Sequence, residues 1–317
     1  AIARNGTWLS PEASWALLEG TAGAAGSGGR ASMDPAVDRV SGPPWAHVGS
    51  PYLQQADVAF PVLHGRNGED GTVQGYLELL GIPYVGSGVL ASAVGMDKAV
   101  MKQLFALHGL PQVAYTVIRR REVEGRIEAV IERIEGALAY PVFVKPANSG
   151  SSLGIFKAPD RAELARALQL SARYDEKLIV EQGLTARELE VAVLDGDPPQ
   201  VSVAGEIIPR NDFYDYEAKY TDGGAELIVP APIDEALQDR LRTYALRAFS
   251  AIDARGLARV DFFLDRTTGG VYLNEINTIP GFTAQSMYPR LWQASGLPYP
   301  ALIDRLIEWA VRGAFMG

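Results

Sequence analysis

Arg259-Val-Asp-Phe-Phe-Leu-Asp265, a Thr-Thr-Gly-Gly turn and Val271-Tyr-Leu-Asn-Glu-Ile-Asn277 form the stretch that decides the fold. Apolar and polar residues alternate on both sides of the turn, which predicts two antiparallel strands. A period of two places Arg259 with Asp261, and Glu275 with Asn277, on common faces. The hairpin therefore gathers three oxygen-bearing side chains and one guanidinium.

This ligand set favours a hard cation. Two carboxylates and an amide oxygen, with no His or Cys beside them in the sequence, suit Mg²⁺, especially where phosphate oxygens complete its shell. The alternative is a polar sheet face that points at water. The strongly apolar flanking positions, with the polar residues on one parity, favour the metal site.

Composition bounds the function. The 317 residues can bury a core large enough for two or three domains. A net charge of -9 argues against a general nucleic-acid binder, so a small-molecule partner is favoured. The absence of cysteine excludes disulfides and thiol chemistry. No apolar run approaches the length of a membrane span, so no membrane partner is expected.

The first half of the chain alternates strands with helices. After a Gly-rich stretch at 20–29, residues 56–63 predict a buried strand, 64–71 a loop and the residues up to Leu80 a helix. Residues 82–85 predict a short strand, and 87–108 a helix interrupted near Gly95. Ligands of α/β sheets bind at the carboxyl ends of strands, so His64 and Glu69 are candidate substrate neighbours; a solvated loop is the alternative.

A loop of small residues is the second strong signal. The predicted strand 141–145 ends in Pro146-Ala-Asn-Ser-Gly-Ser-Ser-Leu-Gly154, after which a strand resumes. Such a loop exposes several N–H groups and hydroxyls to one anion, and Lys145 adds a positive charge. It lacks the Walker A order and leads to a strand. An ordinary hairpin loop is the alternative.

The remaining segments suggest walls and a lid. Strands at 177–180 and 188–194 could line an adenine pocket. Residues 211–224 lack helical or strand periodicity and predict a long binding loop, in which Lys219 and Tyr220 could close over a phosphate. Helices are expected at 234–252, 288–295 and 299–311. Free N–H groups near Ser286 and Met287 could bind a carboxylate by donating hydrogen bonds to it.

Five motifs in unbroken order resemble the D-alanine–D-alanine ligases of the ATP-grasp superfamily. They are His64-Gly-Arg-Asn-Gly-Glu-Asp-Gly, Lys145-Pro-Ala-Asn-Ser-Gly-Ser-Ser, Tyr216-Glu-Ala-Lys-Tyr220, Arg259-Val-Asp261 and Asn274-Glu-Ile-Asn-Thr-Ile-Pro-Gly-Phe-Thr. The resemblance implies an α/β (α+β) ATP-grasp fold with an N-terminal Rossmann-like domain. It implies three domains: 1–95 for substrate, 96–184 as the central domain, and 185–317 with the metal and catalytic site.

The resemblance also implies residue roles. Contacts to ATP would come from Lys98, Lys145, Ser151, Ser152, Glu181, Leu184, Glu188 and Lys219. Two Mg²⁺, for which Mn²⁺ could substitute, would be held by Asp261, Glu275 and Asn277. Substrate contacts would come from His64, Glu69, Tyr220, Arg259, Gly281, Ser286 and Met287. The catalytic set would be Arg259, Tyr220, Ser151, Gly281 and Ser286.

The implied reaction joins two D-alanines through an acyl phosphate, with release of ADP, for peptidoglycan precursor synthesis. In the family, a tyrosine matching Tyr220 goes with an amine acceptor, and phenylalanine with D-lactate. Tyr220 therefore favours the dipeptide over the depsipeptide. A homodimer and a cytoplasmic location are further expectations.

The chain departs from the family at its start. The first family strand, its Gly-Gly loop and the Glu-His-x-Val-Ser segment have no counterpart, so the sequence is expected to begin inside the first domain. Another carboxylate–amine or D-lactate ligase is one alternative. A nucleotide-binding regulator without catalysis is another, which Arg259 and the three metal ligands disfavour.

Overall fold

The computed structural model describes residues 53–150, 152–209 and 225–314. The chain divides into two compact units, Ala1–Asp57 and Val58–Gly317. The described part of the first unit holds one short 3-10 helix, Leu53–Gln55. Within the described ranges, the second unit contains two β-sheets. No helix in the described ranges combines the length and apolar character that crossing a membrane requires.

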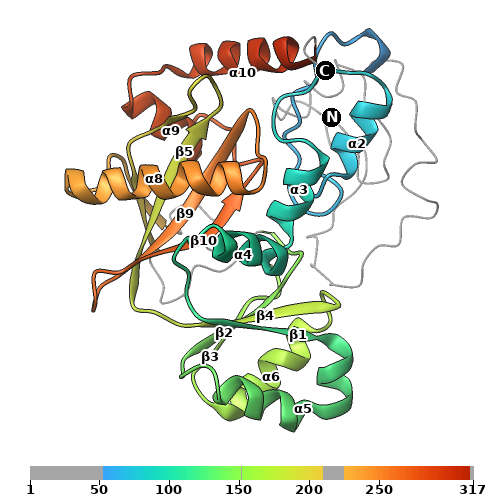
Figure 1. The fold of residues 1–317 in the computed structure, drawn as a ribbon, viewed down its shortest axis with the longest axis vertical. Helices are drawn as coiled ribbons and strands as arrows, with labels where there is room; N and C mark the ends of the chain where they lie inside the picture. Colours follow the sequence, from blue (N-terminus) through green and yellow to red (C-terminus); the bar gives the residue numbers. More distant parts are fainter. Residues whose placement is uncertain (1–52, 151, 210–224, 315–317) are drawn as a thin grey trace, which may run out of the picture. The chain divides into compact units, whose positions relative to one another are not determined.

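A four-stranded antiparallel sheet has the order β1-β4-β2-β3. Its strands are β1 (Tyr115–Arg119), β2 (Val142–Pro146), β3 (Phe156–Ala158) and β4 (Lys177–Gln182). Helices α5 (Arg120–Glu135) and α6 (Arg161–Ser171) pack on one face, where Ile118, Val144 and Val180 are fully buried (Figure 1). Because side chains alternate along a strand, Lys145 and Glu181 belong to the opposite face.

The second sheet has the order β10-β9-β5-β7-β8, with β6 paired to β5. Its strands are β5 (Ala186–Leu194), β6 (Gln200–Val201), β7 (Gly205–Pro209), β8 (Ala225–Ile228), β9 (Leu257–Asp265) and β10 (Val271–Asn277). The predicted hairpin is confirmed: β9 and β10 pair with Asp261 opposite Glu275 and Arg259 opposite Asn277. A register shift between Leu273 and Glu275 creates these two pairs, because the register of Leu273 with Phe262, continued unchanged, would place Asn274 opposite Asp261.

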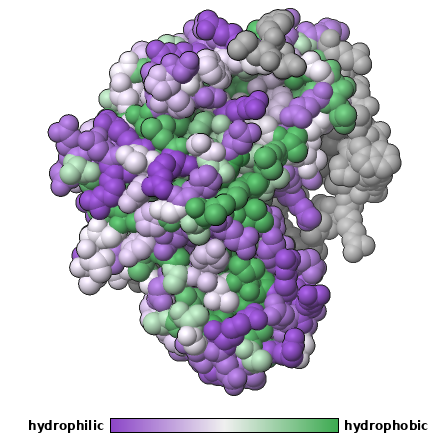
Figure 2. Space-filling view, in the orientation of Figure 1, coloured by the Kyte–Doolittle hydropathy of each residue, from purple (hydrophilic) through white to green (hydrophobic). Residues whose placement is uncertain are grey.

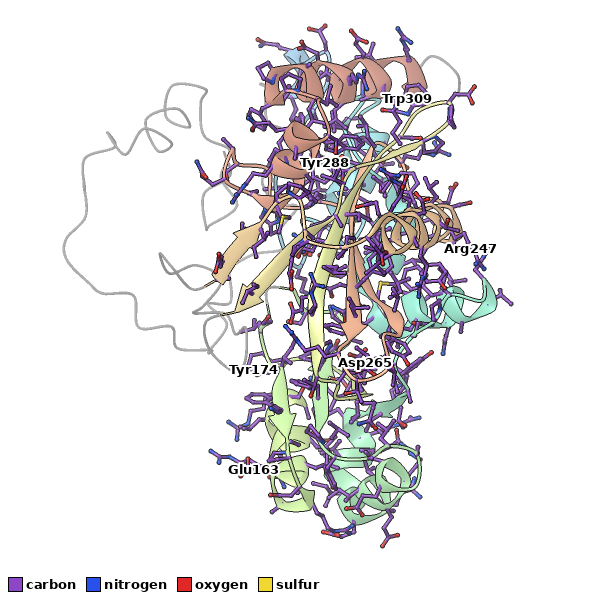
Figure 3. The ribbon with its side chains drawn as sticks, turned by 90° about the vertical axis from the view of Figure 1, so that its left-hand side faces the viewer. Glu163, Tyr174, Arg247, Asp265, Tyr288 and Trp309 are labelled. Atoms are coloured by element: carbon purple, nitrogen blue, oxygen red, sulfur yellow. The ribbon has the colours of Figure 1, made fainter. Side chains whose placement is uncertain are left out.

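Helices from the C-terminal half of the chain pack against this sheet. Helix α8 (Glu235–Ala251) buries Leu241, Ala245 and Phe249 in the core that includes β5, β9 and β10, while its outward side is hydrophilic (Figure 2). Helices α9 (Met287–Ala294) and α10 (Tyr299–Ala314) belong to a separate apolar cluster. In that cluster Tyr288 is fully buried (Figure 3). Its hydroxyl donates to the Val193 carbonyl of β5 at 2.9 Å.

The region before the first sheet contains α2 (Thr72–Leu79), α3 (Val89–Met96) and α4 (Lys98–Leu107). The predicted helix interruption is present, at Asp97, whose carboxylate accepts from the N–H groups of Ala99 and Val100 and so caps α4. The predicted strands at 56–63 and 82–85 are wrong. In the described residues there, only Ala59 and Tyr84 form a bridge, because a strand needs a paired neighbour and apolar character alone supplies none.

The predicted domain boundary at residue 184 falls between β4, the last strand of the first sheet, and β5, the first strand of the second. The predicted boundary at residue 95 falls within α3. The three-part division remains a prediction.

Gly154 closes the small-residue loop after β2 and gives a test of that turn. Its φ is +77°, and a Cβ there would lie 2.8 Å from Pro146 Cγ and 2.8 Å from Tyr174 Cδ2. We expect Gly154→Ala to lower the unfolding free energy by roughly 2–4 kcal/mol, from left-handed strain plus overpacking. The matched control is Gly269→Ala, with φ +68° but no neighbour within 4 Å, for which we expect about 1 kcal/mol. Urea denaturation of both variants measures the difference; equal losses would contradict the packing account.

Candidate active site

Arg259 anchors the polar face of the second sheet. Its Nε lies 2.7 Å from Asp261 Oδ1, its Nη2 lies 2.7 Å from Asp261 Oδ2, and Nε lies 3.0 Å from Glu190 Oε2. Burial alone would lower the pKa of Arg259, but Asp261 and Glu190 raise it above its ordinary value. The guanidinium is therefore permanently charged and held by two carboxylates on adjacent strands.

The three expected metal ligands lie on this face. Asn277 Nδ2 donates to Asp261 Oδ2 at 2.9 Å, so the side-chain amide oxygen of Asn277, Oδ1, could serve as a ligand for a cation. Together with Glu275, these oxygens fit Mg²⁺ chemically. The set has only two carboxylates, and no group of three or more His, Cys, Asp or Glu side chains in the described ranges could hold a metal. A cation here would need further oxygens from its ligands, as Mg²⁺ takes from substrate phosphates.

Lys98 links Glu275 of β10 to the small-residue loop. It is the first residue of α4, and its Nζ donates to the Ser149 carbonyl at 2.9 Å while lying 3.4 Å from Glu275 Oε2. Its backbone N–H donates to the Ala147 carbonyl at 3.0 Å. The side chain is 11% exposed, so a ligand in the open space beside the loop could reach it.

Asp175, which lies just before β4, holds the small-residue loop by hydrogen bonds. Asp175 Oδ2 accepts from the Asn148 N–H at 2.7 Å and from Asn148 Nδ2 at 3.0 Å. Ser149 Oγ donates to the Leu153 carbonyl at 2.8 Å, and Ser152 adopts a φ of +59°. Ser151 lies outside the described residues.

The predicted substrate loop lies against the small-residue loop. Glu69 Oε1 accepts from the Gly65 N–H at 2.8 Å, and a Cβ on Gly150 would be 3.1 Å from that oxygen. Burial is the main cause that raises the pKa of Glu69. His64 is exposed beside it. Two motifs about 80 positions apart in the sequence thus meet, as the predicted site requires.

A buried carboxylate with two lysines lies on the polar face of the first sheet. Glu181 Oε1 is 2.9 Å from Lys102 Nζ, and Oε2 is 2.5 Å from Lys145 Nζ. Burial would raise the pKa of Glu181, but the two ammonium groups lower it to about 2. Burial lowers the pKa of Lys102, and Glu181 opposes that shift, so the charge on Lys102 depends on its carboxylate partner. The pKa of Lys145 is raised, because Glu181 outweighs the effect of burial.

Sequence reasoning missed Lys102 and Glu190. Lys102 follows Lys98 by four residues, which places both on one helix face, but lysines at that spacing usually face solvent. Glu190 follows Glu188 by two residues and so shares its side of β5. That parity signal was present in the sequence and would have found Glu190.

The remaining predicted residues lie as follows. Glu188 is opposite Phe263 in the pairing of β5 with β9, and Leu184 lies between β4 and β5. Of the free N–H groups expected near Ser286 and Met287, that of Ser286 is not free, because it donates to the Thr283 carbonyl at 2.9 Å. Ser286 Oγ would lie 3.0 Å from a Cβ on Gly281, and Met287 begins α9 and is buried. Lys219 and Tyr220 lie outside the described residues.

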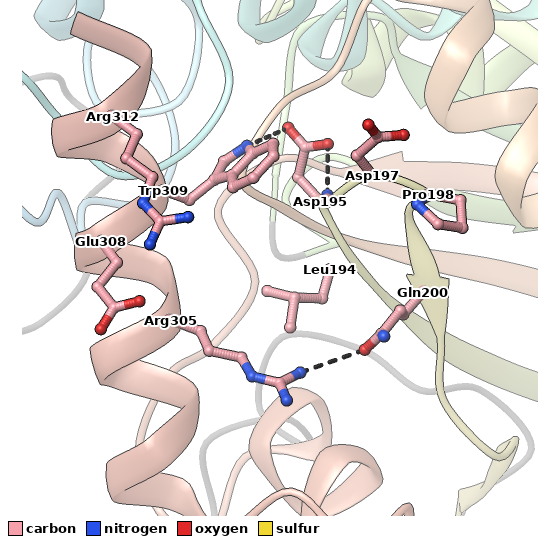
Figure 4. Close-up of a pocket in the computed structure, with 10 residues that line it drawn as sticks. Leu194, Asp195, Asp197, Pro198, Gln200, Arg305, Glu308, Trp309 and Arg312 are labelled. Carbon is pink, nitrogen blue, oxygen red and sulfur yellow. Dashed lines mark hydrogen bonds between the residues drawn. The ribbon is translucent and has the colours of Figure 1, made fainter. Parts of the chain in front are cut away.

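A separate pocket lies elsewhere on the second sheet. It has a volume of about 240 Å³ and lies between the turn after β5 and helix α10 (Figure 4). Trp309 Nε1 donates to Asp195 Oδ2 at 2.9 Å there, and Arg305 lies 3.3 Å from Gln200 Oε1. None of the described site residues lines it. It lies at the Leu194 end of β5, whereas Glu188 is near the start of that strand and Glu190 at its centre, so it does not belong to the site described above.

Comparisons with known proteins point to one family. The family model described as "D-ala D-ala ligase C-terminus" matches residues 104–308, and "D-ala D-ala ligase N-terminus" matches residues 1–87. A D-alanine–D-alanine ligase of Acetivibrio thermocellus is 55% identical over 259 residues, covering 82% of this chain and 69% of the relative. One of Heliobacterium modesticaldum is 57% identical over 252 residues, covering 80% and 69%.

Solved structures agree. The D-alanine–D-alanine ligase from Coxiella burnetii matches with a TM-score of 0.71 at 38% identity, covering 82% of this chain and 69% of that one. The VanG D-Ala:D-Ser ligase from Enterococcus faecalis matches with a TM-score of 0.73 at 39% identity, covering 80% and 73%.

The Arg259 ion pairs generate a stability prediction. We expect Arg259→Ala to lower the unfolding free energy by about 3–5 kcal/mol, because Asp261 and Glu190 would both lose the buried guanidinium that compensates their charges. The matched control is Arg161→Ala. Its side chain is 44% exposed and pairs with Glu128 and Glu135, so we expect a much smaller loss than for Arg259→Ala. Chemical denaturation measures both, and similar losses would refute the assigned role of Arg259.

The Glu181 pKa generates a pH prediction. Its pKa in the fold, about 2, lies below the ordinary value of 4.5, so its ionised form stabilises the fold above pH 4.5 and this contribution fades as pH falls toward 2. We expect Glu181→Gln to cost roughly 3 kcal/mol near neutral pH and progressively less below pH 4.5. Unfolding free energies of both proteins between pH 7 and pH 3 test this. A difference that stays constant with pH would contradict it.

Proposed function

The chain belongs to the D-alanine–D-alanine ligase family, and we propose that the two polar sheet faces and the loop at 146–154 form its active site. The chain is a ligase of the ATP-grasp fold that joins two D-alanines to D-alanyl-D-alanine in an ATP-dependent reaction, a step of peptidoglycan precursor synthesis. The observation that carries the site assignment is the position of Lys98. Its single ammonium group contacts both the loop and the Glu275 carboxylate.

Chemistry sets the order of the two steps. A carboxylate is a poor electrophile at neutral pH, so the first D-alanine must be activated before its carbonyl can accept an amine. One of its carboxylate oxygens attacks the γ-phosphorus of ATP, the bond from that phosphorus to the ADP oxygen breaks, and an acyl phosphate forms. The amine of the second D-alanine then attacks the carbonyl carbon, and inorganic phosphate leaves with the oxygen that bridged it to carbon.

The lysines and Arg259 offset the negative charge that these steps concentrate. We assign Lys98 and Lys145 to the phosphates of ATP, because each side chain is 11% exposed and Lys98 Nζ contacts the small-residue loop at the Ser149 carbonyl. Arg259, aided by the Gly281 N–H, would bind the oxyanion of the tetrahedral intermediate, where a fixed donor stabilises charge most effectively. Two carboxylates already hold the guanidinium, so little reorganisation is needed.

We also propose a divalent cation site on β9 and β10. Asp261, Glu275 and Asn277 would hold Mg²⁺, with Mn²⁺ as a possible substitute, and the ion would supply neutralisation of the phosphoryl oxygens. The fit rests on their hard oxygen donors. Asp261 is shared with Arg259, so the same carboxylate would orient the guanidinium and the cation.

The remaining family positions would supply further nucleotide and substrate contacts. Glu181 and Leu184 would lie at the adenine and Glu188 at the ribose, while His64 and Glu69 would neighbour the first substrate. Ser286 and Met287 would receive the carboxylate of the second D-alanine. Ser151, Ser152, Lys219 and Tyr220 would complete the phosphate and acceptor contacts. We also propose a homodimer in the cytoplasm.

An acceptor panel tests the proposed specificity. We expect the chain with ATP, Mg²⁺ and D-alanine to release phosphate and D-alanyl-D-alanine in equal amounts. L-alanine should give neither, and added D-lactate or D-serine should not replace D-alanine as the favoured acceptor. The D-serine arm matters because one structural relative is a D-Ala:D-Ser ligase. Product analysis by mass spectrometry decides; a mixed product with D-serine as the main outcome would reassign the acceptor.

A metal-ligand variant tests the site. We expect Glu275→Gln to lower dipeptide formation by at least about 100-fold, because it weakens the proposed cation site and removes the carboxylate beside Lys98. Exposed Glu163→Gln serves as the control, with activity unchanged. Full activity in a folded Glu275→Gln protein would place the chemistry elsewhere.

A further inference from the structure

Lys102 is a buried lysine that the proposed reaction does not use. Its side chain is 1% exposed, and its Nζ lies 2.9 Å from Glu181 Oε1. The other oxygen of the same carboxylate is 2.5 Å from Lys145 Nζ. The buried Glu181 carboxylate therefore forms two ion pairs, one through each of its oxygens.

The surroundings of Lys102 fix it in this position. Glu181 lies opposite Tyr115 of β1 and opposite Phe143 of β2. Lys102 Nζ lies 5.6 Å from the centre of the Tyr115 ring, a distance at which a cation is attracted to an aromatic face. The lysine itself projects from α4, so it ties that helix to the sheet. With 1% exposure, Lys102 has no open space into which to move.

Lys145 differs in one decisive respect. Its side chain is 11% exposed, so it can leave the carboxylate for a ligand, whereas Lys102 cannot. A buried carboxylate that loses its only cation is strongly destabilised. With a single lysine partner, Glu181 would retain that lysine and so oppose its transfer to a phosphate. A second, enclosed lysine removes this competition.

We infer that Lys102 is a positioning residue that stays on Glu181 as a fixed counter-ion, so that Lys145 can exchange Glu181 for a phosphate of the bound nucleotide. This inference rests on the proposed function in its assignment of Lys145 to phosphate. It assigns Lys102 no contact with substrate. Lys102 acts through the carboxylate that it shares with Lys145.

A purely structural role is the competing account, in which Lys102 only fastens α4 to the first sheet. The two accounts differ in how Lys102 and Glu181 interact. If Lys102 matters because it compensates Glu181, neutralising Glu181 makes Lys102 dispensable for phosphate binding. If Lys102 only packs, the two substitutions act additively.

The experiment measures dissociation constants for ADP and, by competition, for adenosine. The ratio of the adenosine constant to the ADP constant isolates the contribution of the phosphates from that of the base. We expect Lys102→Met, which keeps the length of the side chain without its charge, to lower this ratio roughly tenfold, as loss of one charge-assisted hydrogen bond would. In the Lys102→Met/Glu181→Gln protein the ratio should return to within about threefold of wild type, since Lys145 is released again.

Lys177→Met is the matched control. Lys177 pairs with Asp97, is 14% exposed and also ties the start of α4 to the first sheet, so it shares the structural role but not the carboxylate. Its ratio should match that of wild type. A similar loss in Lys177→Met, or no recovery in the double variant, would overturn the inference. If Lys102→Met does not fold, the double variant decides alone, because a tenfold lower ratio in the double variant would also overturn the inference.

Failure of the proposed function is distinguishable from failure of this inference. Dipeptide formation by the wild-type protein reports on the reaction and does not involve the ratio. Wild-type dipeptide formation with additive Lys102 and Glu181 effects would reject the role of Lys102 alone. Absence of the dipeptide, with tight ADP binding and a recovered ratio, would reject the reaction and retain the exchange.

Discussion

Ion pairs inside the two facing polar surfaces are the constraint on which the site depends. Asp261 and Glu190 share Arg259, Glu181 shares Lys102 and Lys145, and Glu275 lies against Lys98. Buried charges are tolerated only when compensated, so each surface can fold before a ligand arrives. When a polyanionic ligand binds with its cation, the accessible lysines exchange their carboxylate partners for phosphate, and the carboxylates bind the metal ion. This is a less costly process than desolvating unpaired charges at the moment of binding.

Much of this arrangement was predictable because it depends on local periodicity. The hairpin of β9 and β10 follows from a period of two and one turn, and so do the common face of Arg259 with Asp261 and that of Glu275 with Asn277. The register shift after Leu273, which brings both pairs onto the same face of the sheet, is not encoded in that period. The loop at 146–154 and the helix start at Lys98 follow from small residues and from a capping aspartate, signals that act within a few residues. The family resemblance added the reaction, which periodicity does not contain.

Other features depended on partners distant in sequence. The apolar run at 56–63 has the composition of a strand, yet only Ala59 forms a bridge in the described residues, since pairing is decided by a neighbour. The local sequence around Lys102 is typical of a solvated helix position. Its burial depends on the ion pair with Glu181, which is 79 residues later in the sequence. The Ser286 N–H was expected to be free, but the local turn to Thr283 satisfies it. In each case the deciding contact is tertiary or depends on a turn geometry that periodicity does not encode.

The most direct test of the central claim, that a carboxylate is activated by phosphoryl transfer at this site, is an isotope measurement. D-alanine with ¹⁸O in both carboxylate oxygens would be incubated with the chain, ATP and Mg²⁺, and the released phosphate analysed by mass spectrometry. The account predicts one ¹⁸O atom in each phosphate, since the attacking oxygen bridges phosphorus and carbon and leaves with phosphorus. Unlabelled phosphate accompanying dipeptide formation would contradict an acyl phosphate and the site built around it.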